Sequence, residues 1–375
     1  MRVLVDASAI PADRGGVGRY VDEVLDHLGE AGAATHVICQ RRDAERYAAM
    51  RGAAVHPLPK VLERRALRLG WEQSGLPART LSGVDVLWSP HYTTAVAARI
   101  PRVVTLHDAT FFSDPAVHLR TKARFFRVAT RVALRLAARC VVPSRATRDE
   151  LVRWAGGDAA KIVVAPHGVD RVAFHPPTGA EVEAFCRQHD LRPGHYVAFL
   201  GTLEPRKNVG ALLRGWRRAV AGLADPPPLV LAGAAGWDRT LDDVVAAVRG
   251  PERVVRTGYL DLPVLPALLG GAAVVAYPSL GEGFGLPVLE AMACGATVLT
   301  TRRLSLPEVG GDAVAYTEPD AASIGRNLRS LLDDGARRDV LAAAALERAA
   351  TFSWEASARL HVAAFEAAAS RRVAA

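Results

Sequence analysis

Short apolar runs alternate with amphipathic stretches along the whole chain. Apolar runs bounded by polar or glycine-rich residues are typical of strands buried in parallel sheets. We expect such strands over Arg2–Asp6, Thr35–Cys39, Asp85–Ser89, Arg102–Leu106, Cys140–Pro143, Ile162–Ala165, Tyr196–Leu200, Leu229–Ala232, Val254–Thr257, Ala273–Tyr277 and Thr297–Thr300. Helices are expected between them, for example over Gly18–Leu28, Val209–Val220 and Ala321–Leu332. This alternation predicts an α/β fold of two doubly wound parallel-sheet units.

The length of the chain indicates more than one domain, because 375 residues are too many for one compact core. Proline and glycine interrupt both patterns at residues 174–179, so the boundary is placed there. The predicted domains are residues 1–174 and residues 175–352, followed by a C-terminal helical segment, residues 353–375. In open parallel sheets, ligands bind beyond the carboxyl ends of the strands, so the loops that follow the strands are the places to look for a site.

The charge balance favours an anionic partner. Lys and Arg number 47 against 39 Asp and Glu, a net charge of +8, which suits a phosphate-bearing substrate, an anionic membrane surface or nucleic acid. No nucleic-acid-binding motif is present, so no nucleic-acid partner is expected. The chain starts with a short strand instead of a signal peptide, and no apolar run approaches the roughly 20 residues of a membrane span, so we expect a cytoplasmic protein.

The segment from Glu282 to Glu290 follows the expected strand Ala273–Tyr277 and places two carboxylates around a glycine-rich turn. Pro287 suits the first position of a helix, so Glu290 is expected in the first helical turn and Glu282 in the loop before it. Such a loop offers backbone N–H groups and a helix dipole to an anion. Two carboxylates beside a phosphate site suit a hydroxyl-rich ligand such as a sugar nucleotide. The alternative is an ordinary surface turn.

Two further loops carry residues that suit a diphosphate. Arg206 and Lys207 follow the expected strand Tyr196–Leu200, and adjacent cations there can hold both phosphates of a departing nucleotide. Gly16 lies in a glycine-rich turn between a strand and a helix. This turn lacks the third glycine of the nicotinamide-dinucleotide fingerprint, so it indicates a phosphate contact or merely a tight turn.

His107 and Asp108 stand at the end of the expected strand Arg102–Leu106, where a histidine is either catalytic or structural. No second His or Cys stands at ligand spacing, and the four cysteines (Cys39, Cys140, Cys186 and Cys294) are far apart, so neither a metal nor a disulfide is expected. Each cysteine lies in or beside an apolar segment, which predicts buried free thiols.

Two groups of basic residues have no counterpart in these loops. An expected helix over residues 118–139 carries one group on a single face: Arg120, Arg124, Arg127, Arg131 and Arg135. The second group is Lys60, Arg64, Arg65 and Arg68. They form either solvated faces or a surface that docks onto anionic lipid headgroups, where each cation gives about 1 kcal/mol.

Taken together, these motifs resemble those of the retaining glycosyltransferases of family 4, which have the GT-B fold. The match covers nearly the whole chain and includes Pro143-Ser144-Arg145, His167-Gly168-Val169-Asp170, Arg206-Lys207 and the run from Pro278-Ser279 to Gly295. One departure is His167, where asparagine is common. The glycine-rich turn at Gly15–Tyr20 and Trp71-Glu72-Gln73 resemble a bacterial subgroup that often uses GDP-mannose.

The resemblance implies an acceptor-side domain, a donor domain facing it across a cleft, and a last helix that returns to the first domain. It implies that Glu290 binds the ribose hydroxyls, that Glu282 binds the donor-sugar hydroxyls, and that His107 contacts the donor sugar near the reacting carbon. Catalytic roles are implied for His107, Glu282, Arg206 and Lys207. Donor binding is implied for Gly16, Arg206, Lys207, Ser279, Glu282, Phe284, Gly285 and Glu290. Neither a cofactor nor a metal is expected.

We therefore predict a retaining glycosyltransferase that moves a hexose from a nucleotide sugar to a hydroxyl of a glycan or a lipid-linked acceptor. Mannose from GDP-mannose is the leading donor, and the protein is expected in the cytoplasm or peripherally on the inner face of the plasma membrane. One alternative is a sugar-nucleotide epimerase or isomerase on the same scaffold, with His107 or Asp108 as the base. Another is a non-catalytic nucleotide-sugar sensor.

Overall fold

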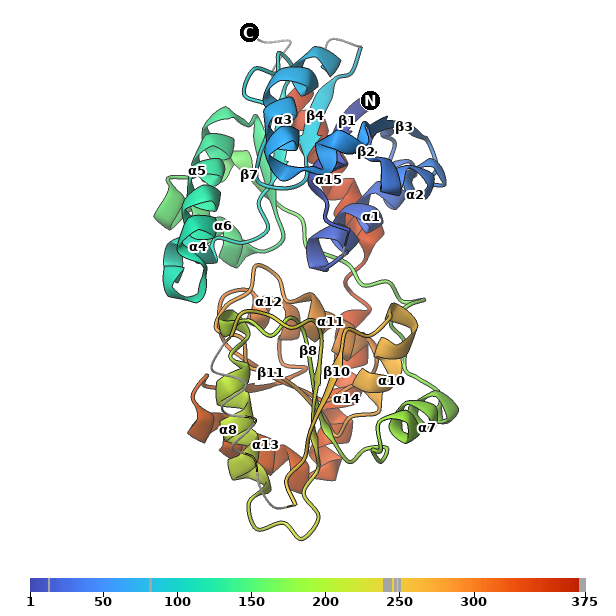
Figure 1. The fold of residues 1–375 in the computed structure, drawn as a ribbon, viewed down its shortest axis with the longest axis vertical. Helices are drawn as coiled ribbons and strands as arrows, with labels where there is room; N and C mark the ends of the chain where they lie inside the picture. The colour runs from blue at the N-terminus through green and yellow to red at the C-terminus, as the bar shows by residue number, and fades with distance from the viewer. Residues whose placement is uncertain (13, 81–82, 239–244, 246–247, 249–250, 371–375) are drawn as a thin grey trace. The chain divides into compact units, whose positions relative to one another are not determined.

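The computed structural model describes residues 1–12, 14–80, 83–238, 245, 248 and 251–370 (Figure 1). Contacts between residues divide the chain into two units. Unit 1 is Met1–Gly168 together with Ser353–Ala375, and unit 2 is Val169–Phe352. Each unit contains one sheet in which every paired strand runs parallel to its neighbour. The expected α/β fold class is therefore confirmed.

The sheet of unit 1 has the strand order β3-β2-β1-β4-β5-β6-β7. The strands are β1 (Arg2–Asp6), β2 (Ala34–Gln40), β3 (Ala53–Leu58), β4 (Val86–Ser89), β5 (Arg102–Thr105), β6 (Arg139–Val142) and β7 (Ile162–Val164). The α-helices are α1 (Gly16–Leu28), α2 (Ala44–Ala48), α3 (Arg65–Arg79), α4 (Thr110–Ser113), α5 (Arg120–Leu136), α6 (Arg145–Ala155) and α15 (Trp354–Ala369). The central strands β1 and β4 are mainly apolar, and all of their residues except Arg2 are buried, as parallel crossover topology requires.

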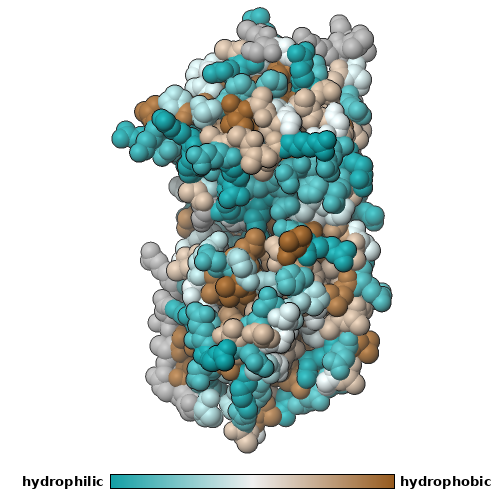
Figure 2. All heavy atoms as spheres, turned by 90° about the vertical axis from the view of Figure 1, so that its right-hand side faces the viewer, coloured by the Kyte–Doolittle hydropathy of each residue, from teal (hydrophilic) through white to brown (hydrophobic). Residues whose placement is uncertain are grey.

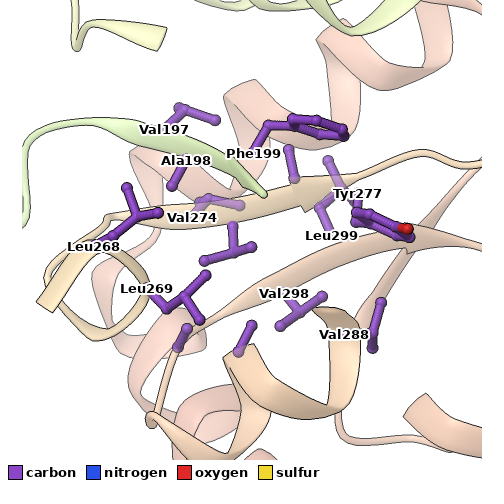
Figure 3. Packing of buried hydrophobic residues seen from close by; sticks show 14 of the residues in the cluster. Val197, Ala198, Phe199, Leu268, Leu269, Val274, Tyr277, Val288, Val298 and Leu299 are labelled. Atoms are coloured by element: carbon purple, nitrogen blue, oxygen red, sulfur yellow. The ribbon is translucent and has the colours of Figure 1, made fainter. Parts of the chain in front are cut away.

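The sheet of unit 2 has the order β10-β9-β8-β11-β12-β13. Its strands are β8 (Val197–Leu200), β9 (Leu229–Ala232), β10 (Val254–Gly258), β11 (Val274–Tyr277), β12 (Val298–Thr301) and β13 (Ala315–Thr317). Its α-helices include α7 (Gly179–Gln188), α8 (Val209–Val220), α10 (Leu265–Gly270), α11 (Leu286–Ala293), α12 (Leu306–Gly310), α13 (Ala321–Asp333) and α14 (Gly335–Ala349). Figure 3 shows the apolar core between strands and helices, in which the Tyr277 ring stacks on Phe199 with centroids 5.8 Å apart.

Each strand expected from the sequence is present, and its ends differ from the expected ones by at most one residue. The sequence did not predict β3 and β13, which lie at opposite ends of the two strand orders as edge strands. β3 is only partly buried and contains Pro57, which a central strand does not tolerate, and β13 has three residues. Both therefore lack the continuous apolar run that marks the other strands.

The last helix, α15, packs on α1 and on the strands β4, β5 and β6 of unit 1 (Figure 1). His361 of α15 is fully buried, and its Nδ1 lies 2.7 Å from the Ser357 carbonyl, so this nitrogen carries the proton. Nε2 must then accept from the Tyr20 hydroxyl, 2.6 Å away. Tyr20 in turn accepts from Thr105 (2.9 Å), and Thr105 accepts from the Trp88 indole (3.0 Å). This relay of neutral groups fixes α15 to the sheet.

The surface in Figure 2 is mainly hydrophilic, with hydrophobic residues in small separate groups. Among the described residues, no helix is both long and apolar enough to cross a membrane. All four cysteines are buried and free, as expected from the sequence. Burial raises the pKa of the Cys140 thiol to about 12, so this thiol is protonated at neutral pH.

We expect Gly168→Ala to loosen the attachment of α15. A Cβ on Gly168 would lie 2.2 Å from the Trp354 backbone nitrogen, a contact that only a backbone shift can relieve. The free energy of unfolding should fall by about 2–3 kcal/mol, and hydrogen exchange along α15 should accelerate. Gly179→Ala is the matched control, because a Cβ there meets no atom within 4 Å. Unchanged protection of α15 in the Gly168 variant would contradict this expectation.

Candidate active site

Two loops at the carboxyl edge of the unit 2 sheet are tied together by hydrogen bonds. The first follows β8 and contains the short 3₁₀ segment Pro205–Lys207, and the second follows β11. Leu280 N donates to the Arg206 carbonyl (2.9 Å), and the Asn208 side-chain amide donates to the carbonyls of Pro278 (3.2 Å) and Pro319 (2.7 Å). Asn208 adopts a left-handed conformation (φ 59°), which asparagine tolerates better than most residues.

The carboxylate of Glu282, 7% exposed, lies at the centre of a buried ionic cluster. Arg206 Nη1 donates to its Oε2 at 2.5 Å, and Lys207 Nζ donates to its Oε1 at 2.7 Å. The hydroxyls of Tyr277 (2.9 Å) and Ser279 (2.6 Å) also donate to Oε1. Arg206 Nη2 pairs with Glu204 at 2.7 Å. Thus Arg206, Lys207, Ser279 and Glu282, all singled out from the sequence, come together.

The protonation states in this cluster follow from burial and from the neighbouring charges. Burial favours the neutral acid, but Arg206 and Lys207 outweigh it and lower the pKa of Glu282 to about 2. Burial and then Arg206 lower the pKa of Lys207, although Glu282 opposes this shift. Burial and the Glu282 charge raise the pKa of Tyr277 well above its usual value, so its hydroxyl remains a donor. At neutral pH, Glu282 is therefore a carboxylate held by two cations and two hydroxyls.

The loop between Glu282 and α11 is held by Ser305. Its fully buried hydroxyl lies 2.8 Å from the carbonyl oxygens of both Glu282 and Phe284 and shares its proton between them. Gly285 then forms the N-cap of α11 with φ +107°, and a Cβ there would also meet the Leu306 side chain at 2.9 Å. This position therefore requires glycine both for its backbone angle and for space.

One detail expected for α11 is wrong. The helix begins at Leu286, so Pro287 is its second residue and not its first, and Glu290 lies beyond the first turn. Pro287 is still accommodated, because the early N–H groups of a helix have no intrahelical partner. Glu290 is 2% exposed and stands one turn before Cys294, whose thiol pKa is raised by burial and by the Glu290 charge. The structure thus places Glu290 inside α11, as its fifth residue.

His107 belongs to the carboxyl edge of the unit 1 sheet, directly after β5. Its Nε2 lies 2.7 Å from the Pro90 carbonyl, which can only accept, so Nε2 carries the proton. Burial lowers the pKa of His107 to about 4, against the opposing influences of Pro90 and Asp108. The ring is therefore neutral at physiological pH, and its Nδ1 is an acceptor. This tautomer suits a contact with a hydroxyl and not with an anion.

Gly16 is the first residue of α1, a helix of 13 residues capped by Gly15. The sequence placed the start of this helix two residues later, at Gly18. Within the described residues, a Cβ on Gly15 would meet nothing within 4 Å, whereas one on Gly18 would lie 3.1 Å from Arg14 Cδ. Space around the backbone at Gly15 fits the expected role of this turn, and Gly16 stands at the helix N-terminus as the sequence indicated.

Three contributors to the site were missed from the sequence: Tyr277, Ser305 and Glu204. Tyr277 ends an apolar strand and was counted with the core, although a hydroxyl at the carboxyl end of a parallel strand is a usable signal. Ser305 acts through a contact that only folding creates, whereas Glu204 pairs with Arg206 only two residues later, and this spacing was a usable signal. Across the part of the chain that the structure describes, no three His, Cys, Asp or Glu side chains are grouped so as to hold a metal ion.

Comparison with known families defines the class of this protein. The model described as Glycosyltransferase Family 4 matches residues 14–172, and the model described as Glycosyl transferases group 1 matches residues 187–348. The protein is a glycosyltransferase. It belongs to glycosyltransferase family 4, which confirms the resemblance seen in its motifs.

Several relatives are mannosyltransferases by name. The chain is 33% identical over 258 residues to O-antigen chain mannosyltransferase B of Escherichia coli, covering 68% of this chain and 67% of the relative. It is 36% identical over 174 residues to the serotype-specific mannosyltransferase WbdA of Escherichia coli, of which it spans only 21%. Over 96% of its length it is 26% identical to D-inositol 3-phosphate glycosyltransferase of Pseudarthrobacter chlorophenolicus, of which it covers 92%.

Solved structures share the GT-B fold at low sequence identity. A sucrose-phosphate synthase from Thermosynechococcus elongatus matches with a TM-score of 0.79 and 19% identity, covering all of both chains. HepE of Anabaena, in complex with UDP and glucose, matches with a TM-score of 0.75 and 18% identity over 97% of this chain and 98% of that chain. At these identities the likeness shows the fold alone.

We expect Glu282→Gln to change how stability depends on pH. Because the folded pKa is lowered from 4.5 to about 2, Glu282 contributes stability that is fully present above pH 4.5 and is lost as pH falls towards 2. The variant should be less stable than the parent by about 3 kcal/mol near neutral pH, and the gap should narrow in acid. Denaturant unfolding of the parent and the variant over this pH range measures the difference in their free energies of unfolding.

The matched control is Glu183→Gln on the exposed face of α7, which should track the parent at every pH. A stability gap for Glu282→Gln that stays constant from neutral to acid pH would show that the carboxylate charge is not what holds the cluster.

Proposed function

We propose that the protein transfers a hexose from a nucleotide sugar, with mannose from GDP-mannose as donor, to a hydroxyl of a glycan or lipid-linked acceptor with retention of configuration. The observation that carries this proposal is the Glu282 carboxylate, held by Arg206 and Lys207 at the carboxyl edge of the unit 2 sheet in a family 4 chain. The mannosyltransferase relatives support the choice of sugar.

The donor diphosphate would bind at Arg206 and Lys207, whose side chains are 14% and 10% exposed. Cations in a dry site interact strongly with phosphate, and Arg206 offers a planar fork of donors for it. In the structure both cations are paired with carboxylates. A bound diphosphate would either replace a carboxylate as the partner of a cation or bind as an additional partner. Protein cations and α11 amides would supply the charge that a metal supplies elsewhere, and we therefore propose transfer without a metal.

The donor sugar would lie beside Glu282, which offers acceptor oxygens to sugar hydroxyls. The neutral His107, with Nδ1 as an acceptor, suits a sugar hydroxyl in the same way, and Glu290 would serve the ribose. For retention we propose a front-face path in which the glycosyl–phosphate bond breaks as the acceptor oxygen attacks. The departing phosphate takes the acceptor proton, so no side chain has to act as nucleophile.

We expect Glu282→Ala to lower kcat by about 10²–10³-fold, since it removes a partner of the charge that develops during transfer. Glu290→Ala should instead raise the donor KM by tenfold or more, because it removes a charged acceptor for two hydroxyls. Initial rates with GDP-mannose, GDP-glucose, UDP-glucose and ADP-glucose measure both effects and identify the donor. Glu183→Ala is the exposed control.

Four results would contradict the proposed function. One is near-parent transfer by both variants, which would refute the two assignments. A second is activity that disappears with EDTA and returns with magnesium, which would refute metal independence. The third is an altered sugar recovered after donor is incubated without acceptor, which would identify an epimerase. The fourth is donor binding without transfer to any acceptor, which would indicate a sensor.

We also propose that unit 1 docks on anionic membranes through a surface that we call the basic face. It consists of exposed residues of α5 and of the segment that leads into α3: Lys60, Arg64, Arg65, Arg120, Arg124, Arg131 and Arg135. The Arg65 guanidinium lies 5.1 Å from the Phe125 ring, so the two groups are adjacent. Val61, Leu119 and Val128 are more than half exposed among them, as suits insertion beside lipid headgroups.

Two arginines expected on this surface are engaged elsewhere. Arg127 donates to the Phe111 carbonyl at 2.5 Å and is only partly exposed. Arg68 is 8% exposed and pairs with Glu72. Neither side chain belongs to the basic face, because each is held by the interior of unit 1.

Co-sedimentation with vesicles tests the basic face. Parent protein should bind vesicles that contain phosphatidylglycerol but not pure phosphatidylcholine, and added salt should release it. Replacing Arg120, Arg124 and Arg131 by Gln should lower the binding constant by about 100-fold, at about 1 kcal/mol per cation. The control replaces the exposed Arg218 and Arg326 of unit 2 in the same way. Salt-independent binding, or equal loss in the control, would remove this proposal.

A further inference from the structure

Unit 1 contains a second ionic network. It lies in the interior of the unit and is not part of the basic face. Arg68 is 8% exposed, Glu72 is fully buried, and Asp6 is 4% exposed. Arg68 Nη1 donates to Glu72 Oε2 at 2.8 Å, and Thr93 donates to the same oxygen at 2.9 Å. Arg68 Nη1 also approaches the Ser8 hydroxyl at 3.5 Å, and Ser8 donates to Asp6 Oδ1 at 2.5 Å.

This network lies at the carboxyl edge of the unit 1 sheet. Asp6 is the last residue of β1, and Thr93 follows the end of β4, the neighbour of β1 in the sheet. His107 follows the end of β5, the next strand. Open parallel sheets bind their ligands at the loops along this edge. The network therefore lies where a binding site is expected.

The charges in the network do not balance. Two carboxylates, Asp6 and Glu72, face one guanidinium, Arg68. Burial raises the pKa of Asp6, although the hydrogen bonds from Ser8 and the charge of Arg68 act to lower it. Burial and then the charge of Asp6 raise the pKa of Glu72. A second buried carboxylate therefore costs folding free energy at neutral pH. The Asp6 side chain caps the 3₁₀ turn Ala7–Ala9, a role that a neutral acceptor could also fill.

Two oxygen acceptors in this region are available to a ligand. Ser8 donates to Asp6 Oδ1 through both its backbone N–H and its hydroxyl, and these bonds leave Oδ2 available. The Gln40 amide is 2% exposed and donates to the carbonyls of Ser8 (2.9 Å) and Leu62 (3.2 Å), while Oε1 has no donor among the described residues. A buried acceptor without a donor, such as Gln40 Oε1, is costly and therefore rare. Together with a negative balance, the two acceptors suit a ligand that donates hydrogen bonds and exclude an anion.

We propose that Asp6, supported by Ser8, Arg68 and Glu72, binds a hydroxyl of the acceptor sugar or polyol. Asp6 Oδ2 accepts a hydrogen bond from the hydroxyl group of the ligand. Arg68 and Glu72 fix the charges around Asp6, and Thr93 orients Glu72. This inference rests on the proposed function, because it assigns the acceptor to unit 1 and gives its recognised group a chemical class: neutral hydroxyls and not phosphate.

The test compares Asp6→Asn with Asp26→Asn, an exposed control on α1. With methyl α-mannoside or myo-inositol as probe acceptor, Asp6→Asn should raise the acceptor KM by about 10–100-fold, the effect of losing a hydrogen bond to a charged group. The donor KM should stay unchanged, and the melting temperature should stay or rise, because an unbalanced buried charge is removed. Thr93→Val should raise the acceptor KM less, about threefold to tenfold.

A purely structural role for Asp6 predicts a different pattern of results. If Asp6→Asn lowers the melting temperature and impairs donor and acceptor use together, or leaves the acceptor KM unchanged, the inference is wrong. Calorimetric titration with the same probes and with inorganic phosphate tests the acceptor subsite independently of the proposed transfer function. Polyol binding that weakens in Asp6→Asn supports the subsite even if no donor is ever used. Binding of phosphate alone, or of none of the probes, overturns it.

Discussion

The structure depends on where a parallel sheet allows charged groups to be buried. Crossover helices cover both faces of such a sheet, so its strands must be apolar, and polar side chains collect at the carboxyl edge. Both units obey this constraint. In unit 2 the edge holds Lys207 after β8 and Glu282 after β11. In unit 1 it holds Asp6 at the end of β1 and His107 after β5. The fold thus creates two polar edges, and the sequence decides what each edge can bind.

The two edges differ in charge and therefore in chemistry. Around Glu282, two cations meet two carboxylates, and a diphosphate arriving there would find arginine and lysine already desolvated. Around Asp6, two carboxylates meet one guanidinium, which repels phosphate and attracts hydroxyl donors. A glycosyl transfer needs both kinds of recognition, one for the nucleotide diphosphate and one for the sugar alcohol. On the proposed assignments, the balance of buried charge would divide this recognition between the two sheets.

The sequence predicted what repeats locally and missed what depends on distant contacts. Central strands were located to within one residue, because continuous apolar runs bounded by glycine and polar residues have few alternatives. The edge strands β3 and β13 carry no such run. Arg206, Lys207, Ser279 and Glu282 were found because they follow strand ends. Ser305 was missed because it lies 23 residues from the carbonyl that it binds. Arg68 was grouped with the exposed cations because the burial of its pair with Glu72 depends on packing that the sequence does not show.

Buried polar groups in unit 1 fall into two kinds, and the difference bears on how function is recognised. The relay from Trp88 through Thr105, Tyr20 and His361 consists of neutral groups, each donating to the next. Burial keeps His361 neutral by lowering its pKa to about 4, so the relay costs little and simply holds α15 in place. The Asp6 network keeps charge and adjoins a buried acceptor without a donor among the described residues. Folding alone favours the first arrangement, because a saturated neutral relay satisfies every group without burying charge. An arrangement of the second kind, at a sheet edge where open parallel sheets bind their ligands, therefore supports the proposed acceptor subsite.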